Sequence, residues 1–160
     1  YPFLLPPTNN ILGLRVSGVT LMHLVIDGYN GNVEKMKDSE FVHNFLNSYP
    51  DAIGMTKITE PHVYEYHGQH PEDWGVSGFV IIAESHISVH TFPERNYINI
   101  DLFSCRDFDT EKALQEIKSD FELGQTKSWT LERGLEYSEP EVALRELNTD
   151  REHLTHTREN

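Results

Sequence analysis

The chain has 160 residues, a formal net charge of −13 at pH 7 and a single cysteine, Cys105. That length suits one domain with a real core, and the negative charge would repel the phosphate backbone of a nucleic acid. Its apolar runs are far shorter than the roughly 20 residues of a membrane span and no basic-then-apolar leader opens it, so we expect a cytoplasmic protein with no membrane partner.

The first third of the chain predicts an arm, a strand and a helix. Residues 1–18 contain prolines and paired asparagines, which break regular structure and favour a surface arm. Residues 19–26 are mostly β-branched or apolar, which predicts a strand that ends at the turn formed by Asp27-Gly28. Asp38 or Ser39 can cap a helix with one apolar stripe, and Tyr49-Pro50 is expected to end it.

The middle and end of the chain predict further strands and a second helix. Residues 55–67 contain Pro61 and favour an edge strand or two short pieces. Residues 79–83 are apolar throughout, which predicts a central strand covered on both faces. Residues 98–102 alternate apolar and polar side chains, which predicts a strand with one buried face. Asp109 can cap a helix that ends near Gly124, and residues 125–131 predict a last strand.

These elements predict an α+β fold, because the strands occur in runs and do not alternate with helices. We expect an antiparallel β-sheet with helices packed on one face, which is a two-layer α/β sandwich. The chain divides into an N-terminal arm at 1–18, one domain at 19–134 and a charged C-terminal tail at 135–160 that contains a short amphipathic segment.

Four nucleophilic or proton-handling side chains lie at or beside predicted strand ends: Ser77, Ser85, His90 and Cys105. A hydrolase with a serine or cysteine nucleophile and a histidine base is one interpretation, but the Gly-x-Ser-x-Gly elbow is absent. Ordinary polar residues that hydrogen-bond within a sheet are another.

Two histidine pairs raise the possibility of a metal site. His67 and His70 are three residues apart, and His86 and His90 are four apart. A spacing of four places two ligands on one face of a helix, yet the residues between His86 and His90 favour a strand. We therefore expect no metal.

The motif from Gly75 to Glu94, with the Ile100–Cys105 segment that follows it, resembles the prokaryotic S-adenosylmethionine decarboxylase proenzyme family. The specific features are a Glu-Ser-His block at 84–86, a His-x-x-Pro-Glu block that ends at Glu94, and a cysteine twenty residues after Ser85. The resemblance implies a pyruvoyl-dependent enzyme that is made as a proenzyme. It also implies an α/β sandwich that forms a homodimer, with active sites that draw on both protomers.

The resemblance implies a role for each of the four reactive residues. Ser85 Oγ would attack the carbonyl of Glu84 and turn the peptide bond into an ester, so the chain would cleave itself between Glu84 and Ser85. His90 would act as the base for elimination, and Ser77 would hold the attacked carbonyl. A pyruvoyl group would replace Ser85 and form a Schiff base with the substrate amine. Cys105 would then donate a proton to the substrate.

The substrate residues of the resemblance favour S-adenosylmethionine, whose decarboxylated product serves polyamine (spermidine) biosynthesis. Glu94 stands where the family has a carboxylate for the ribose hydroxyls, and Phe92 where it has an aromatic near the nucleoside. Pro71 stands where the family usually has a stacking phenylalanine, so Trp74 or Tyr66 is a candidate replacement.

Two other functions stay open from the sequence. Glu72 and Asp73 would suit a pyruvoyl-dependent arginine or ornithine decarboxylase, because their charges can hold a cationic substrate. The second is an uncleaved, non-catalytic binding or regulatory subunit, in which the Glu84–Ser85 bond stays intact.

Overall fold

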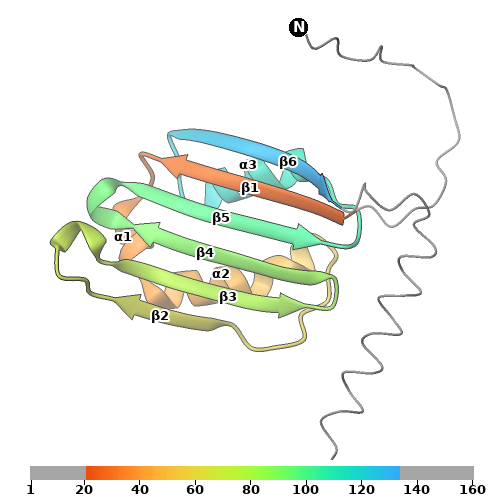
Figure 1. Ribbon diagram of the computed structural model, residues 1–160, viewed down its shortest axis with the longest axis horizontal. Helices are drawn as coiled ribbons and strands as arrows, with labels where there is room; N and C mark the ends of the chain where they lie inside the picture. The colour runs from red at the N-terminus through yellow and green to blue at the C-terminus, as the bar shows by residue number, and fades with distance from the viewer. Residues whose placement is uncertain (1–20, 134–160) are drawn as a thin grey trace, which may run out of the picture. The chain divides into compact units, whose positions relative to one another are not determined.

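The computed structural model describes residues 21–133, which form one antiparallel sheet and three helices (Figure 1). The strands are β1 (Leu21–Tyr29), β2 (His62–Tyr66), β3 (Gly75–Ile82), β4 (Ser85–Phe92), β5 (Tyr97–Ser104) and β6 (Gln125–Arg133). The helices are α1 (Val33–Lys37), α2 (Ser39–Ala52) and α3 (Thr110–Asp120), with the 3-10 turns η1 (Pro71–Asp73) and η2 (Pro93–Arg95). The expected N-terminal arm, C-terminal tail and its amphipathic segment lie outside the described residues.

The sheet confirms the predicted α+β fold. Its strand order is β2-β3-β4-β5-β1-β6, and every neighbouring pair is antiparallel. All three helices lie on one face of the sheet, behind it in the view of Figure 1. We call the other face the open face, since no helix of residues 21–133 covers it. No helix in this same range is long and apolar enough to cross a membrane.

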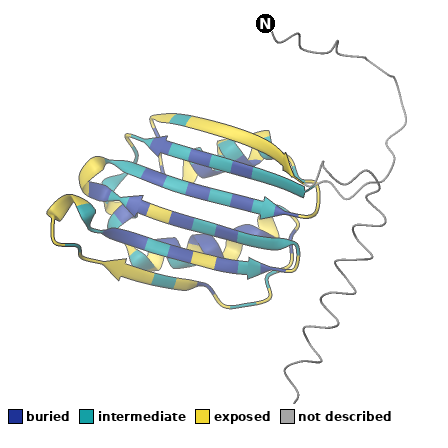
Figure 2. Ribbon diagram, in the orientation of Figure 1, coloured by how far each residue is buried: buried dark blue, intermediate teal, exposed yellow. Residues whose placement is uncertain are grey.

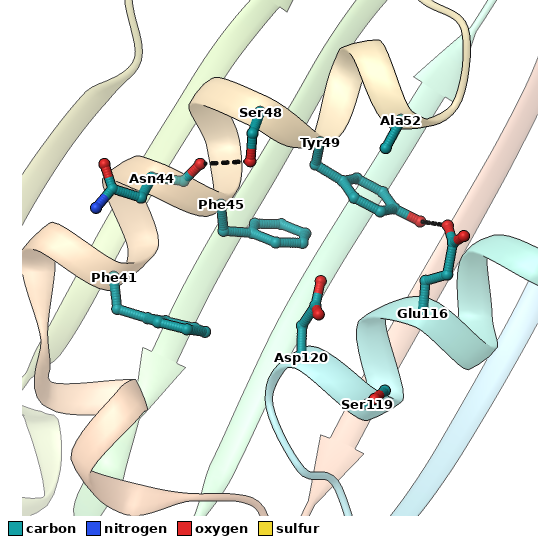
Figure 3. Close-up of a pocket in the computed structure, with 9 residues that line it drawn as sticks. All are labelled: Phe41, Asn44, Phe45, Ser48, Tyr49, Ala52, Glu116, Ser119 and Asp120. Atoms are coloured by element: carbon teal, nitrogen blue, oxygen red, sulfur yellow. Dashed lines mark hydrogen bonds between the residues drawn. The ribbon is translucent and has the colours of Figure 1, made fainter.

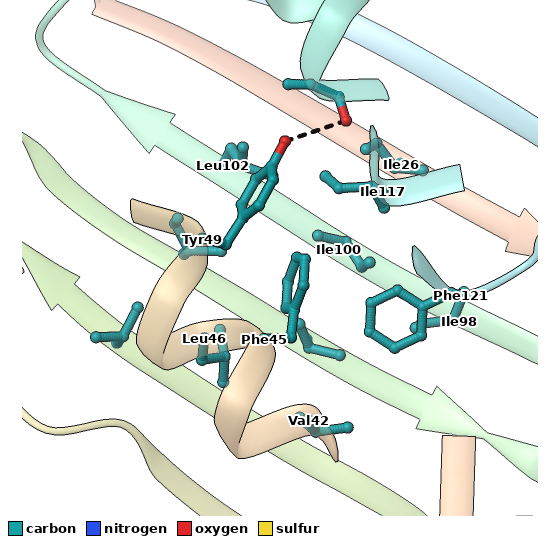
Figure 4. Packing of buried hydrophobic residues seen from close by; sticks show 14 of the residues in the cluster. Ile26, Val42, Phe45, Leu46, Tyr49, Ile98, Ile100, Leu102, Ile117 and Phe121 are labelled. Atoms are coloured by element: carbon teal, nitrogen blue, oxygen red, sulfur yellow. Dashed lines mark hydrogen bonds between the residues drawn. The ribbon is translucent and has the colours of Figure 1, made fainter. Parts of the chain in front are cut away.

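The core lies between the sheet and the helices. Burial alternates along the central strands, as Figure 2 shows, because successive side chains of a strand point to opposite faces. Ile87 and Val89 of β4 and Ile98 and Ile100 of β5 are completely buried toward the helices. They meet the apolar stripes of α2 and α3, where the Phe121 ring stands edge-on to that of Phe45 at 5.1 Å (Figure 4).

Both predicted helix caps are confirmed. Asp38 Oδ1 accepts hydrogen bonds from the backbone N–H groups of Glu40 and Phe41, at 2.9 and 3.0 Å. Asp109 Oδ1 accepts one from the N–H of Lys112 at 2.9 Å. The predicted stop at Pro50 is wrong, because α2 continues to Ala52 with Pro50 inside it. Proline inside a helix removes one backbone donor and crowds the preceding turn, yet here α2 continues for two residues past Pro50, which is buried in the protein.

The structure corrects the predicted bounds of two other segments. β1 does not end at the Asp27-Gly28 pair but runs on to Tyr29, since Gly28 packs where a Cβ would lie 2.6 Å from Ile98. Of residues 55–67 only His62–Tyr66 form a strand, and this β2 is an edge strand as expected. The short helix α1 was not predicted, because five residues are too few for a recognisable apolar period.

The prediction that residues 79–83 are covered on both faces is wrong for the single chain. Phe79 is 40% exposed on the open face, where its ring stacks on that of His62, directly opposite on β2, at 5.2 Å between ring centroids. The strand is apolar on both faces, but the helices cover only one of them. The open face therefore carries apolar surface that one copy of the described chain leaves uncovered.

Candidate functional site

The Glu84–Ser85 peptide lies at the tight turn between β3 and β4, where three hydrogen bonds hold it. The carbonyl oxygen of Glu84 accepts from the backbone N–H of Cys105 at 2.8 Å. The side-chain carboxylate of Glu84 accepts a hydrogen bond from the backbone N–H of Thr56 at 3.0 Å. The backbone N–H of Ala83 donates to the carbonyl of Thr56 at 2.8 Å. The turn is thus fixed on one side by the end of β5 and on the other by the loop before β2.

Ser85 has an unusual backbone conformation directly after this peptide. Its φ is 155°, a region that residues with a Cβ rarely occupy and that costs about 1–3 kcal/mol. Its Oγ lies 3.2 Å from Nδ1 of His86. Cys105 directly follows β5, at the end of this strand that pairs with Ser85, and it is exposed. The structure therefore brings Glu84, Ser85 and Cys105 together within one chain.

Ser77 and His90 form a second group on the open face of the sheet. They are directly opposite each other on β3 and β4, and His90 Nδ1 lies 2.9 Å from Ser77 Oγ. Glycines flank Ser77 because neighbours approach closely: a Cβ on Gly75 would lie 1.9 Å from the Thr91 carbonyl oxygen, and one on Gly78 2.8 Å from Leu46 of α2. The Gly-Val-Ser-Gly motif thus sets the position of Ser77 in the sheet.

The two groups do not meet within one chain. Ser85 begins β4, and His90 lies five residues further along the same strand. At roughly 3.3 Å per residue, this places them about 16 Å apart. The residues that the sequence grouped as one site therefore form two clusters, which we call the cleavage cluster (Glu84, Ser85, Cys105) and the histidine cluster (Ser77, His90).

The predicted substrate residues lie at the same end of β4 as the histidine cluster. Phe92 ends β4 and stacks on Tyr97 at 5.7 Å between ring centroids, and Glu94 lies in η2 directly after it. Lys37 connects Glu94 with Trp74: its Nζ is 3.6 Å from Glu94 Oε1 and 5.8 Å from the centre of the Trp74 ring. Glu94 is also exposed, so a ligand at this end of β4 can reach its carboxylate.

The acids beside Pro71 have different surroundings. Asp73 Oδ1 accepts a hydrogen bond from Arg95 at 3.2 Å, which compensates its charge and ties η1 to η2. Pro71 itself begins η1 and is exposed. On the open face, β2 places Tyr64 directly opposite Ser77, and this ring is 63% exposed. Tyr66, opposite Gly75, is 62% exposed.

The cavity that the structure shows lies on the helix-covered side of the sheet, away from both clusters. It is a groove of about 540 Å³ between α2 and α3, shown in Figure 3. Phe41, Phe45 and Tyr49 line it on α2, and Glu116 and Asp120 on α3. Tyr49 O–H donates to the Ala113 carbonyl at 3.2 Å, and burial raises the pKa of its hydroxyl. None of the predicted site residues lines this groove.

No three His, Cys, Asp or Glu side chains within residues 21–133 converge on a point that could hold a metal ion. His86 and His90 both lie on the open face of β4, but a separation of four strand residues is about 13 Å. That distance is far too large for the two rings to bind one ion, since Zn–N bonds are about 2 Å.

Comparison with known proteins identifies the family. The family model described as S-adenosylmethionine decarboxylase matches residues 22–134. The chain belongs to the S-adenosylmethionine decarboxylase family. An S-adenosylmethionine decarboxylase proenzyme of Archaeoglobus fulgidus is 33% identical over 113 residues, which is 70% of this chain and 96% of that protein. One of Clostridium botulinum is 38% identical over 97 residues, covering 60% of this chain and 78% of the relative.

A solved structure supports the same family. The crystal structure of the adenosylmethionine decarboxylase from Aquifex aeolicus superposes with a TM-score of 0.64 at 26% identity, over 77% of this chain and 98% of that one. The predicted resemblance to the S-adenosylmethionine decarboxylase family and the predicted fold are therefore confirmed. Glu84, Ser85, His90, Cys105 and their partners all lie inside the matched range.

The sequence did not identify three contacts of the site. The backbone N–H of Cys105 holds the Glu84 carbonyl, Lys37 contacts Glu94, and His86 Nδ1 lies beside Ser85 Oγ. The first two join segments that are far apart in the sequence, so no local spacing predicts them. His86 directly follows Ser85 in the Glu-Ser-His block, but neighbouring strand residues point to opposite faces, so no sequence pattern predicts the third contact.

Proposed function

We propose that this protein is a self-processing, pyruvoyl-dependent decarboxylase of S-adenosylmethionine that supplies polyamine biosynthesis. The observation that carries the proposal is the Glu84–Ser85 peptide, which lies in a strained turn with its carbonyl oxygen 2.8 Å from a backbone donor. Family membership supports the reaction, since the relatives named above are decarboxylase proenzymes.

Cleavage starts from the conformation of Ser85. Attack of Ser85 Oγ on the Glu84 carbonyl carbon places negative charge on the carbonyl oxygen, where the N–H of Cys105 already donates. The strained φ of Ser85 raises the energy of the intact peptide by about 1–3 kcal/mol and so favours its conversion to the ester. His90 then serves as the base for elimination of the ester.

The residues of the cleavage cluster also fit the group that cleavage produces. A pyruvoyl group at position 85 supplies an electron sink for loss of carbon dioxide from an α-amino acid. Cys105 directly follows β5 beside this position, and its exposed thiol serves as the proton donor to the substrate carbon. Ser77, which belongs to the histidine cluster, positions the carbonyl of Glu84.

The separation of the two clusters supports a homodimer in which each site takes residues from both copies. Within one chain Ser85 and His90 are about 16 Å apart along β4. The open face exposes apolar surface, including Phe79 at 40% and Trp129 at 48%. Packing two open faces about a two-fold axis buries this surface and brings the histidine cluster of one copy to the cleavage cluster of the other.

The adenosyl part of the substrate is assigned to the end of β4. The Glu94 carboxylate accepts hydrogen bonds from the two ribose hydroxyls, and Phe92 and Trp74 supply aromatic surface. Because Pro71 has no aromatic ring to stack on adenine, Tyr64 and Tyr66, which are opposite Ser77 and Gly75, are the best-placed replacements.

Complementation between two inactive variants tests the proposed function. The Ser85→Ala and His90→Ala chains should each stay uncut when expressed alone. When they are co-expressed, intact-mass measurement should show cleavage of the His90→Ala chain, because its Ser85 meets His90 of the other copy. The first fragment should end at Glu84, and the second should lack a free amino terminus.

Three results would contradict parts of the proposal. A wild-type chain that stays full-length after prolonged incubation would favour the non-catalytic subunit. Release of carbon dioxide from arginine or ornithine, but not from S-adenosylmethionine, would retain the pyruvoyl mechanism and refute the adenosyl substrate. Cleavage of His90→Ala when expressed alone would refute the need for this histidine.

A further inference from the structure

His86 is a nitrogen base in direct contact with the proposed nucleophile. Its Nδ1 lies 3.2 Å from Ser85 Oγ, whereas His90 lies about 16 Å along the strand. The Ser85 hydroxyl donates to Nδ1 when the ring proton of His86 is on Nε2. The residue next to the scissile bond thus has the geometry of a general base in the intact chain.

The surroundings of His86 keep its ring neutral. Burial lowers its pKa, and the charges of His23 on β1 and Arg133 on β6 lower it further. Asp101 on β5 acts in the opposite direction, but His23 Nε2 is 3.0 Å from that carboxylate and shares it. The Phe103 ring, 5.7 Å from the imidazole centroid, covers one side. An imidazole with a pKa below 6.5 is mostly neutral at pH 7 and can accept a proton.

We propose that His86 is the general base for the first step of self-cleavage, the transfer of the Glu84 acyl group from nitrogen to oxygen. The Ser85 Oγ–H proton passes to His86 Nδ1 as the bond between Oγ and the Glu84 carbonyl carbon forms. The imidazolium then returns that proton to the backbone nitrogen of Ser85 as the carbon–nitrogen bond breaks. The products are an ester and a free amine, with no other reactant consumed.

This proposal rests on the proposed function and divides the chemistry between two histidines. His86 acts within its own chain and starts the acyl transfer, while the N–H of Cys105 stabilises the charge on the Glu84 oxygen. His90 acts later, from the second copy, on the α-proton of Ser85. The ester should therefore form without His90 and persist when His90 is absent.

The experiment follows ester formation in a His90→Ala background. Chains are made by cell-free synthesis at pH 5 to 8, and samples are treated with hydroxylamine, which cleaves an ester but leaves the peptide intact. The fragment that ends at Glu84 is quantified by mass spectrometry. His86→Ala is added to this background, with and without exogenous imidazole. His43→Ala is the matched control, because His43 lies on α2 on the helix-covered side of the sheet.

His86→Ala should slow ester formation by about 100-fold, the lower end of what general base catalysis contributes. Imidazole should restore part of the rate, and His43→Ala should leave it unchanged. The rate in the His90→Ala chain should fall as the pH drops below the lowered pKa of His86. This fall should be absent from the His86→Ala chain.

Three outcomes would overturn the inference. The first is an unchanged rate of ester formation in the chain that carries His86→Ala. The second is a rate of ester formation that does not vary between pH 5 and 7 in the His90→Ala chain, which keeps His86. This measurement does not depend on whether a His86 variant folds. The third is a slowed His86→Ala chain that unfolds cooperatively but is not rescued by imidazole. Failure of the proposed function is distinguishable, because wild-type chains would then give neither ester nor cleavage.

Discussion

Thr91 is buried between His90 and Phe92, and its hydroxyl joins three elements. It is 2% exposed. Its Oγ1 accepts a hydrogen bond from the Val76 N–H at 2.8 Å and donates to the Met36 carbonyl, also at 2.8 Å. The substitution Thr91→Val keeps the shape of the side chain but leaves a buried donor without a partner, which costs about 1–3 kcal/mol, and removes a second hydrogen bond worth about 1 kcal/mol. We expect a loss of about 2–4 kcal/mol in the free energy of unfolding.

Urea unfolding of Thr91→Val measures this loss. A Ser85→Ala background keeps the chain uncut, so that one species unfolds. With a slope of about 2 kcal/mol per molar urea, within the usual range for small proteins, the midpoint should fall by roughly 1–2 M. Thr91→Ser is the control, because it keeps both hydrogen bonds and loses one methyl group, worth about 1 kcal/mol. A Thr91→Val chain as stable as Thr91→Ser would refute the assignment of this hydroxyl.

Two further predictions concern a carboxylate of the α2–α3 groove and the thiol of the cleavage cluster. Burial raises the pKa of Asp120, and Glu116 raises it further against the opposing charge of Lys35. The ionised group therefore destabilises the fold above both its folded and its unfolded pKa. Asp120→Asn should raise the melting temperature at pH 7, with a difference that shrinks as the pH falls toward 3; an unchanged or lowered melting temperature at pH 7 would contradict this. Cys105→Ala keeps the backbone N–H that holds the Glu84 carbonyl, so it should still self-cleave in an intact-mass assay. Its release of carbon dioxide should fall by about 100-fold, and unchanged turnover would remove the thiol from the mechanism.

The parts of the fold that the sequence predicted are those set by local rules. The Asp38 and Asp109 caps and the alternation of residues 98–102 each express a preference of neighbouring residues, and the structure confirms them. The parts that it did not predict depend on distant partners. Gly28 resembles a turn residue but packs against Ile98 and Leu123 inside a strand, and the ring of Pro50 is buried.

The candidate site divides in the same way. The resemblance located Ser85, His90 and Cys105, but it could not show which of them meet in one chain. By strand alternation alone, Ser85 and His86 would point to opposite faces of the sheet. Their contact accompanies the unusual φ of Ser85, and no pattern of residue types predicts that angle.

Strand β4 carries both residues of the core and residues of the proposed reaction. Its alternate residues Ile87, Val89 and Thr91 are buried under the helices, while His86 and His90 have the opposite parity and lie on the open face. Because a strand alternates, the helix that buries one set of side chains cannot cover the other. Both histidines therefore lie on the face without a helix, where a single copy leaves His90 exposed. Covering that face with a second copy, as proposed above, would exclude water from His90 and bring it to Ser85 of the other chain.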